Sequence, residues 1–179
     1  MEIYDSSYLG KAYLASIFYE SVKDNTWLVF GGVNPWEDED NPPRVSPNLY
    51  QITDTFLSVY FHYTRLVREN VNGELNLDGQ RYLEVDDDLD ALSISANRPN
   101  AIYMECHVSS SAINSINSVA DYRMMAVYHS VQYDSSPELN EGTFMNSNPN
   151  TFILDKCITF SPRTVSSLDS QTIKIVKRF

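Results

Sequence analysis

The stretch WLVFGGVNPW, residues 27–36, decides how this chain begins to fold. Its first four residues form a short apolar run of the kind that a buried β-strand carries. Gly31 and Gly32 then interrupt the run, and Pro35 fixes the backbone of a turn that ends on the large aromatic Trp36. The glycine pair lacks the third glycine and the following helix of a phosphate-binding loop. The stretch therefore predicts a strand and a rigid turn rather than a nucleotide site.

A helix is expected before this strand. Residues 8–22 contain no proline, and Asp5 or one of the two serines after it can cap the first turn. Large apolar residues of this segment are spaced to share one broad face, namely Leu9, Tyr13, Ile17 and Phe18. We therefore expect an α-helix from Tyr8 to Val22.

Beyond residue 36 the chain alternates β-prone runs with loops. Acidic residues and prolines make 37–43 an exposed loop, and 134–150 is a long polar loop. A short helix is expected to start at Thr53 or Asp54. Further strands are expected over residues 26–30, 59–63, 74–77, 101–108, 122–131, 152–160 and 168–179. This order predicts a mainly β chain, an antiparallel β-sandwich with an N-terminal α-helix and one further short helix, in a single domain over residues 1–179.

Composition and charge disfavour several classes of partner. The 179 residues include 13 Lys and Arg against 24 Asp and Glu, for a formal net charge of −11. Nonspecific nucleic-acid binding needs clustered basic residues, and so does binding to an anionic membrane surface. No apolar run reaches the ~18 residues of a membrane span, and the first residues do not resemble a signal peptide. We expect no nucleic-acid or membrane partner and synthesis in a cytoplasm-like compartment.

The histidines and cysteines form no recognisable catalytic or metal-binding motif. His62, His107 and His129 lie far apart, each in a strand-like segment, and we expect structural roles for all three. Cys106 and Cys157 lack CxxC spacing. We expect both thiols to be free and to serve as small buried apolar residues of strands.

The acidic run at residues 86–90 is the one cluster with a metal-like spacing. Asp86, Asp88 and Asp90 match the first half of a calcium loop. The glycine that makes the sharp turn of that loop is missing, and Asn97 stands where its final Glu belongs. We expect a solvated turn here, no cofactor and no enzymatic activity, and the sequence leaves a metal ion in this turn open.

The chain closes on an alternating segment, residues 168–179, that ends in Phe179. Residues of one parity are expected to face the core, namely Ile173, Ile175, Lys177 and Phe179. A terminal strand frays unless it is tied into a sheet. We therefore expect Phe179 to fill a hydrophobic site, either within the subunit or on a neighbour.

Three segments together resemble a known family. VFGGVNPW at residues 29–36 is similar to its G-[R/K]-x-x-P-W turn, with Gly32 at the usual basic position, and the acidic, proline-rich 37–43 follows as in the family. YRMMAV at 122–127 is similar to its aromatic-Arg strand, and DSQTIKI at 169–175 to its last strand, with an extra Ser and without a Glu. On these motifs, within residues 8–45 and 120–179, the chain resembles the baseplate wedge proteins of contractile-tailed bacteriophages, the family of a dimeric β-sandwich wedge subunit.

The resemblance implies a structural virion protein of the tail baseplate, assembled in the host cytoplasm. It implies self-association as a homodimer or higher oligomer and packing against other tail proteins. Candidate interface or turn anchors are Gly31, Pro35, Trp36, Arg163 and Phe179. Two alternatives remain open at this point. Tyrosines and tryptophans are also the stacking platforms of a carbohydrate- or receptor-binding β module, and carboxylates in a pocket would indicate a hydrolase.

Overall fold

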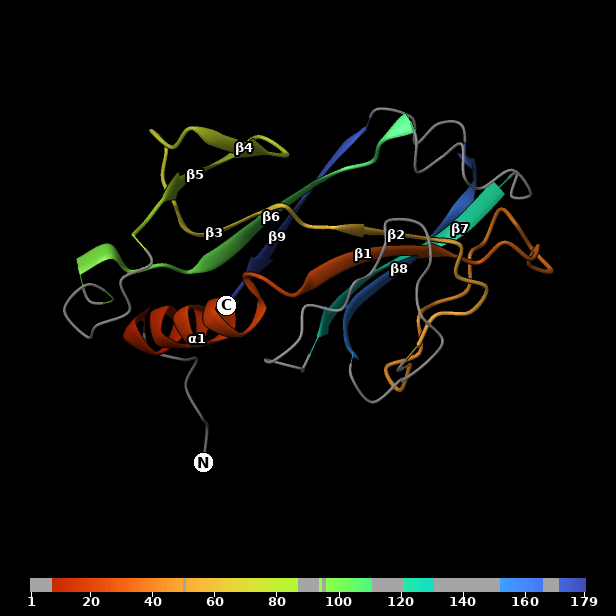
Figure 1. Cartoon of the computed structure of the whole chain (residues 1–179), viewed down its shortest axis with the longest axis horizontal. Helices are drawn as coiled ribbons and strands as arrows, with labels where there is room; N and C mark the ends of the chain where they lie inside the picture. Colours follow the sequence, from red (N-terminus) through yellow and green to blue (C-terminus); the bar gives the residue numbers. More distant parts are fainter. Residues whose placement is uncertain are drawn as a thin grey trace. The chain divides into compact units, whose positions relative to one another are not determined.

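The computed structural model describes residues 8–49, 51–86, 94, 96–110, 121–130, 152–165 and 171–179 (Figure 1). The chain divides into two compact units. The first unit comprises Met1–Asp24, His62–Glu105 and Lys174–Phe179, and the second comprises Asn25–Phe61 and Cys106–Ile173. Each unit is described below by itself.

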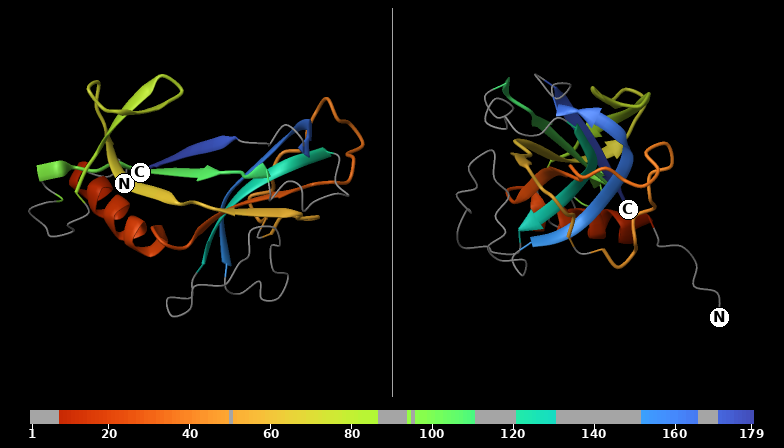
Figure 2. Two further views of the ribbon diagram at one scale, coloured as in Figure 1. Left: turned by 45° about the horizontal axis from the view of Figure 1, so that its top comes forward. Right: turned by 90° about the vertical axis from the view of Figure 1, so that its right-hand side faces the viewer.

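One helix and nine strands have defined bounds in the described residues (Figures 1 and 2). They are α1 (Tyr8–Val22), β1 (Thr26–Gly31), β2 (Leu57–Tyr60), β3 (Tyr63–Glu69), β4 (Leu75–Leu77), β5 (Gln80–Glu84), β6 (Ala101–His107), β7 (Asp121–Ser130), β8 (Phe152–Thr164) and β9 (Thr172–Arg178). One sheet has the order β2-β1-β7-β8 and the other β4-β5-β3-β6-β9. The predicted class is confirmed: the chain is mainly β, its two sheets are antiparallel, and they are consistent with a β-sandwich-like fold.

Helix α1 begins and ends where the sequence predicts, but its buried face differs from the predicted one. The buried residues are mostly small, and they are Ala12, Ala15, Ser16, Tyr19 and Val22. The Ser16 hydroxyl donates to the carbonyl of Ala12 at 2.9 Å, which satisfies this buried polar group. Leu9, Tyr13 and Ile17, expected to share a face with Phe18, are about half exposed instead.

The five-stranded sheet contains its own hydrophobic cluster in the first unit. Its buried members are Val67, Tyr82, Ala101, Tyr103 and Val176. Strand β9 follows the edge of β6, and the Phe179 N–H donates to the Asn100 carbonyl at 3.0 Å. The sequence predicted that the odd-numbered residues of β9 face the core, and this was wrong in part. The even-numbered Val176 is buried, while Ile175, Lys177 and Phe179 are half-buried.

The four-stranded sheet is built around β1, all six residues of which are buried. Trp27 and Val29 pack with Ile52, Ala126 and Tyr128 in one cluster. Aromatic rings form a second cluster on Phe30, whose ring centroid lies 5.6 Å from that of Tyr122. Burial on both faces explains why the run at residues 27–30 reads as continuously apolar rather than alternating.

The short helix predicted to start at Thr53 or Asp54 is absent. The Gly32 N–H donates to the Thr53 carbonyl at 3.1 Å, and the Phe56 N–H donates to the Phe30 carbonyl at 3.0 Å. These bonds tie the segment to the end of β1, and Asp54 takes a left-handed φ of 52° that breaks helical geometry. The predicted strand at 59–63 is two strands, β2 and β3, separated by Phe61 and His62.

We predict that Val176→Ala lowers the free energy of unfolding by about 1–3 kcal/mol, because it removes buried methyl groups from the first unit's cluster. Val71→Ala is the matched control, since Val71 is 83% exposed and the change should stay within about 0.5 kcal/mol. Urea denaturation of both variants measures the difference. Equal effects of the two substitutions would show that Val176 of β9 does not contribute to the stability of the fold.

Candidate functional site

Within the second unit, the turn after β1 is held to β7 by the buried side chain of Arg123. This residue lies in β7 and is only 5% exposed. Its Nη1 donates to the carbonyls of Val33 at 3.2 Å and Gly32 at 3.5 Å. Its Nε and Nη2 reach the carboxylate of Glu39 at 2.8 Å and 2.7 Å. One guanidinium group therefore satisfies two backbone carbonyls and one acidic side chain.

Both glycines of this turn are required by their surroundings. A Cβ atom on Gly31 would lie 2.6 Å from the Thr53 carbonyl oxygen. Gly32 has a φ of +71°, and a Cβ there would lie 2.8 Å from a side-chain carbon of Met124. The backbone of the turn thus lies so close to the backbone of the segment before β2 that only glycine fits between them.

The acidic loop after Trp36 is held in several places. Asp38 accepts hydrogen bonds from the N–H groups of Asp40 and Asn41, and the Thr159 hydroxyl donates to the Pro43 carbonyl at 2.7 Å. Hydrogen bonding from Arg123 lowers the pKa of Glu39 below its ordinary value. The loop predicted at 37–43 is thus largely exposed but anchored at both ends. We call the contacts of Arg123 with Gly32, Val33 and Glu39 the Arg123 joint.

The predicted anchors do not form one site. Gly31 belongs to the turn held by the Arg123 joint, while Pro35 beyond it is exposed and Trp36 is half-buried. Arg163 is exposed on β8, where its guanidinium carbon lies 4.9 Å from the centroid of the Phe160 ring. Phe179 belongs to the first unit, where its ring centroid lies 5.6 Å from that of Phe18. This contact lies within the subunit, and the Phe179 side chain remains half-buried.

Neither Arg123 nor Glu39 was predicted as a functional residue, although both are central to the turn. A signal was present, because a lone arginine in an otherwise apolar strand requires a partner once it is buried.

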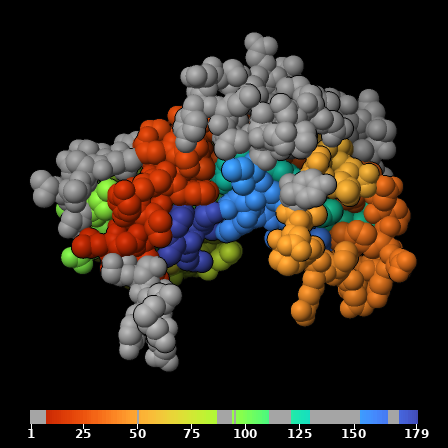
Figure 3. Space-filling model, turned by 90° about the horizontal axis from the view of Figure 1, so that it is seen from below, coloured from red at the N-terminus to blue at the C-terminus, as the bar shows by residue number. Residues whose placement is uncertain are grey.

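Helix α1 presents an apolar surface in the first unit. Leu9, Tyr13, Leu14 and Ile17 are 51%, 56%, 51% and 50% exposed, and we call these four residues the α1 outer face. Figure 3 shows atoms of α1, in red, open at the surface. Tyr8, at the start of the helix, is 58% exposed, with the Arg98 guanidinium carbon 5.8 Å from its ring centroid.

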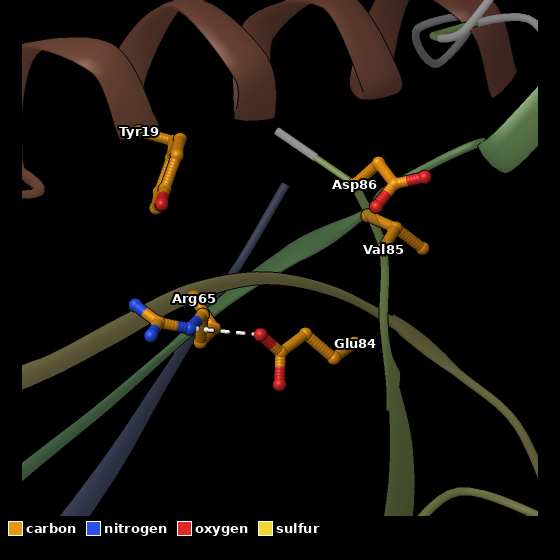
Figure 4. A pocket seen from close by; sticks show the side chains of 5 residues that line it. All are labelled: Tyr19, Arg65, Glu84, Val85 and Asp86. Carbon is orange, nitrogen blue, oxygen red and sulfur yellow. Dashed lines mark ion pairs between the residues drawn. The ribbon is translucent and has the colours of Figure 1, made fainter. Parts of the chain in front are cut away.

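A polar hollow of about 420 Å³ also lies in the first unit (Figure 4). It is lined by Tyr19, Arg65, Glu84, Val85 and Asp86. Arg65 Nε lies 2.8 Å from a Glu84 carboxylate oxygen, and the other oxygen accepts a bond from the Tyr63 hydroxyl at 2.8 Å. Glu84 is therefore engaged by two partners rather than poised beside a second carboxylate.

A third polar cluster is buried in the four-stranded sheet. His129 Nδ1 lies 2.9 Å from the Thr26 hydroxyl, and its Nε2 lies 3.4 Å from an Asp155 carboxylate oxygen. Thr26 is 1% exposed and His129 is 6% exposed, so this hydroxyl is closed to a substrate. The cluster fits the structural role predicted for His129.

The cysteines and acidic residues add no metal centre in the described part of the chain. Neither Cys106 nor Cys157 forms a disulfide; Cys106 is buried as expected, whereas Cys157 is only half-buried, and burial raises its pKa to about 11. No group of three metal-ligating side chains occurs among the described residues. Asp86 is exposed, and the remainder of the predicted calcium-like turn, 87–90, lies outside them. Within the same residues, no helix is long and apolar enough to cross a membrane.

Comparison with known proteins adds no assignment: no protein-family model matches the chain, and no curated protein matches it.

We predict that Arg123→Ala destabilises the chain by about 1–3 kcal/mol, because it leaves the Gly32 and Val33 carbonyls without their buried donor. Arg163→Ala is the matched control, an exposed arginine of the same unit that should cost at most about 1 kcal/mol. Urea denaturation followed by circular dichroism measures both. Equal losses would contradict a central role for the Arg123 joint.

A second prediction concerns pH. Since the folded pKa of Glu39 is lowered, its stabilising contribution is complete above the ordinary value of 4.5 and is lost as the pH falls through the lowered folded value. Glu39→Gln should therefore be less stable than the wild type at pH 7, and the gap should narrow below about pH 4.5. The lowered pKa of Asp38 acts equally in both proteins and cancels.

Urea midpoints at pH 7 and pH 3 measure this gap, and Glu37→Gln serves as the neighbouring control. A gap between Glu39→Gln and wild type that stays constant from pH 7 to pH 3 would show that the ion pair with Arg123 contributes nothing to stability.

Proposed function

We propose that the chain is a structural subunit of a phage tail baseplate wedge, acting by packing against itself and against neighbouring tail proteins. The observation that carries this proposal is the α1 outer face, because large apolar side chains that share a helix face in solvent are typical of a protein-interaction surface. Half-exposed Tyr13 and Leu14 at its centre are typical of residues that become buried on assembly.

The Arg123 joint supports the proposal from the second unit. Two of the segments on which the phage resemblance depends, the turn at 31–36 and the strand at 122–127, are bonded to each other through Arg123. A turn held in this way presents Pro35 and Trp36 on a fixed backbone. Rigid presentation of an aromatic residue favours binding, because little conformational entropy is lost when a partner docks.

A carbohydrate- or receptor-binding module of a phage tail is the second candidate. The polar hollow beside Tyr19 favours it, since a tyrosine with charged groups around it can stack on and hydrogen-bond a sugar (Figure 4). The hollow's guanidinium and one of its carboxylates are already bonded to each other, so this pair is less available to a sugar. The assembly role therefore has the stronger support.

Deletion of the coding gene, with complementation by the wild-type gene, tests the proposal in the virus that carries it. Without the chain, electron micrographs should show particles that lack complete baseplates, and complementation should restore them. Complete baseplates in the deletion strain would contradict the wedge assignment. Complete particles that no longer adsorb to cells would contradict it as well and favour the receptor-binding module.

A further inference from the structure

Helix α1 carries apolar side chains on several sides, yet three of its five buried residues are small while several of its large side chains are about half exposed. The buried face includes Ala12, Ala15 and Ser16, whereas Leu9, Tyr13, Leu14 and Ile17 lie outside and are about half exposed. A helix that is hydrophobic all round is normally buried all round. The size distribution therefore indicates a second packing surface on the outer side.

The α1 outer face carries no unpaired charge among the described residues. At 3.6 residues per turn its four side chains span about 140° of arc, with Gly10 near the middle. One acidic residue, Glu20, lies within this arc, one turn beyond Ile17, and its carboxylate is paired at 2.9 Å with Lys23 just after the helix. Although the whole chain has a net charge of −11, two copies of this face would not place unpaired like charges opposite each other.

We propose that a second copy of this chain docks on the α1 outer face, with the two helices antiparallel across a two-fold axis between Tyr13 and Leu14. This inference rests on the proposed assembly function and names one of its partners. In such a pair Tyr13 lies opposite Leu14 of the other copy, and Ile17 lies opposite Gly10. A large side chain thus faces the smallest one, so the face is complementary to itself, as a two-fold interface requires.

The area is that of a small, reversible dimer. Four half-exposed large side chains and the residues beside them offer roughly 500 Å² per copy, or about 1,000 Å² for the pair, at the lower limit of specific interfaces. The pairing should therefore dissociate on dilution. A basic partner, which the net charge alone would favour, would gain little from this uncharged surface.

Sedimentation velocity of the full chain over a range of concentrations tests the proposal. We expect monomer and dimer in concentration-dependent exchange. Ile17→Asp should weaken self-association by at least roughly thirtyfold, the effect of losing a central apolar anchor. Val71→Asp is the matched control, because Val71 is a more exposed apolar residue of the same unit and should leave the dimer unchanged. Thermal melts establish that both variants fold.

Gly10→Leu tests the register separately. Leucine is the better helix former, so the change should not weaken the helix itself, but it fills the position opposite Ile17 and should abolish the dimer. In a Cys157→Ser background, a mixture of Gly10→Cys and Ile17→Cys chains should form a disulfide-linked dimer on mild oxidation. Either variant alone should form little disulfide-linked dimer, because position 10 of one copy faces position 17 of the other.

A chain that is monomeric at every concentration would overturn the proposal, as would an Ile17→Asp variant that dimerises normally or a mixture that does not cross-link. If the wild type is monomeric but Ile17→Asp still blocks incorporation into particles, the second copy is the wrong occupant and the assembly function stands. If the dimer forms as described while particles assemble without the chain, the pairing stands and the wedge function fails.

Discussion

The side-chain sizes around helix α1 set the central constraint on this molecule. Short side chains at Ala12, Ala15 and Ser16 form most of its buried face, whereas the four large side chains of the α1 outer face remain about half exposed. Keeping such a surface in water costs roughly 25 cal/mol per Å² of apolar area relative to burial. The chain's own described residues leave this face about half exposed, and the proposed assembly role would remove that cost by covering it with a partner.

The second unit meets a different constraint, which is the burial of a charge. A guanidinium group in a strand is unfavourable unless every donor has an acceptor, and the turn after β1 supplies carbonyls and a carboxylate for that purpose. The same contacts fix the course of the acidic loop, and the two glycines make the approach possible. A rigid surface of this kind would suit the proposed assembly role, since little conformational entropy would be lost on docking.

Much of the secondary structure could be predicted from local patterns. The bounds of α1 followed from its caps and its lack of breakers, and β1 followed from a continuous apolar run before a glycine pair. Local patterns could not show which side of α1 faces inward, because apolar residues occur on several sides of the helix and their spacing does not single out one face. The prediction of which side of β9 faces the core was wrong for a related reason, since Val176 and Ile175 are equally apolar.

The partners of Arg123 could not be identified from local patterns either. Its partners Glu39, Val33 and Gly32 lie 84, 90 and 91 residues away along the chain. The helix predicted near Thr53 failed because tertiary backbone bonds to the end of β1 overrode local preference. Contacts between residues so far apart along the chain cannot be predicted from local patterns in a single sequence.

Hydroxyl-radical footprinting tests most directly whether the α1 outer face is covered when the protein works. The purified chain, diluted until it no longer self-associates, should be labelled readily at Tyr13 and Leu14. In assembled particles that contain the chain, we predict that both residues become strongly protected while Val71 in the same unit stays labelled. Equal labelling of Tyr13 and Leu14 in the two samples would contradict the account, because the large apolar side chains would then remain in water throughout.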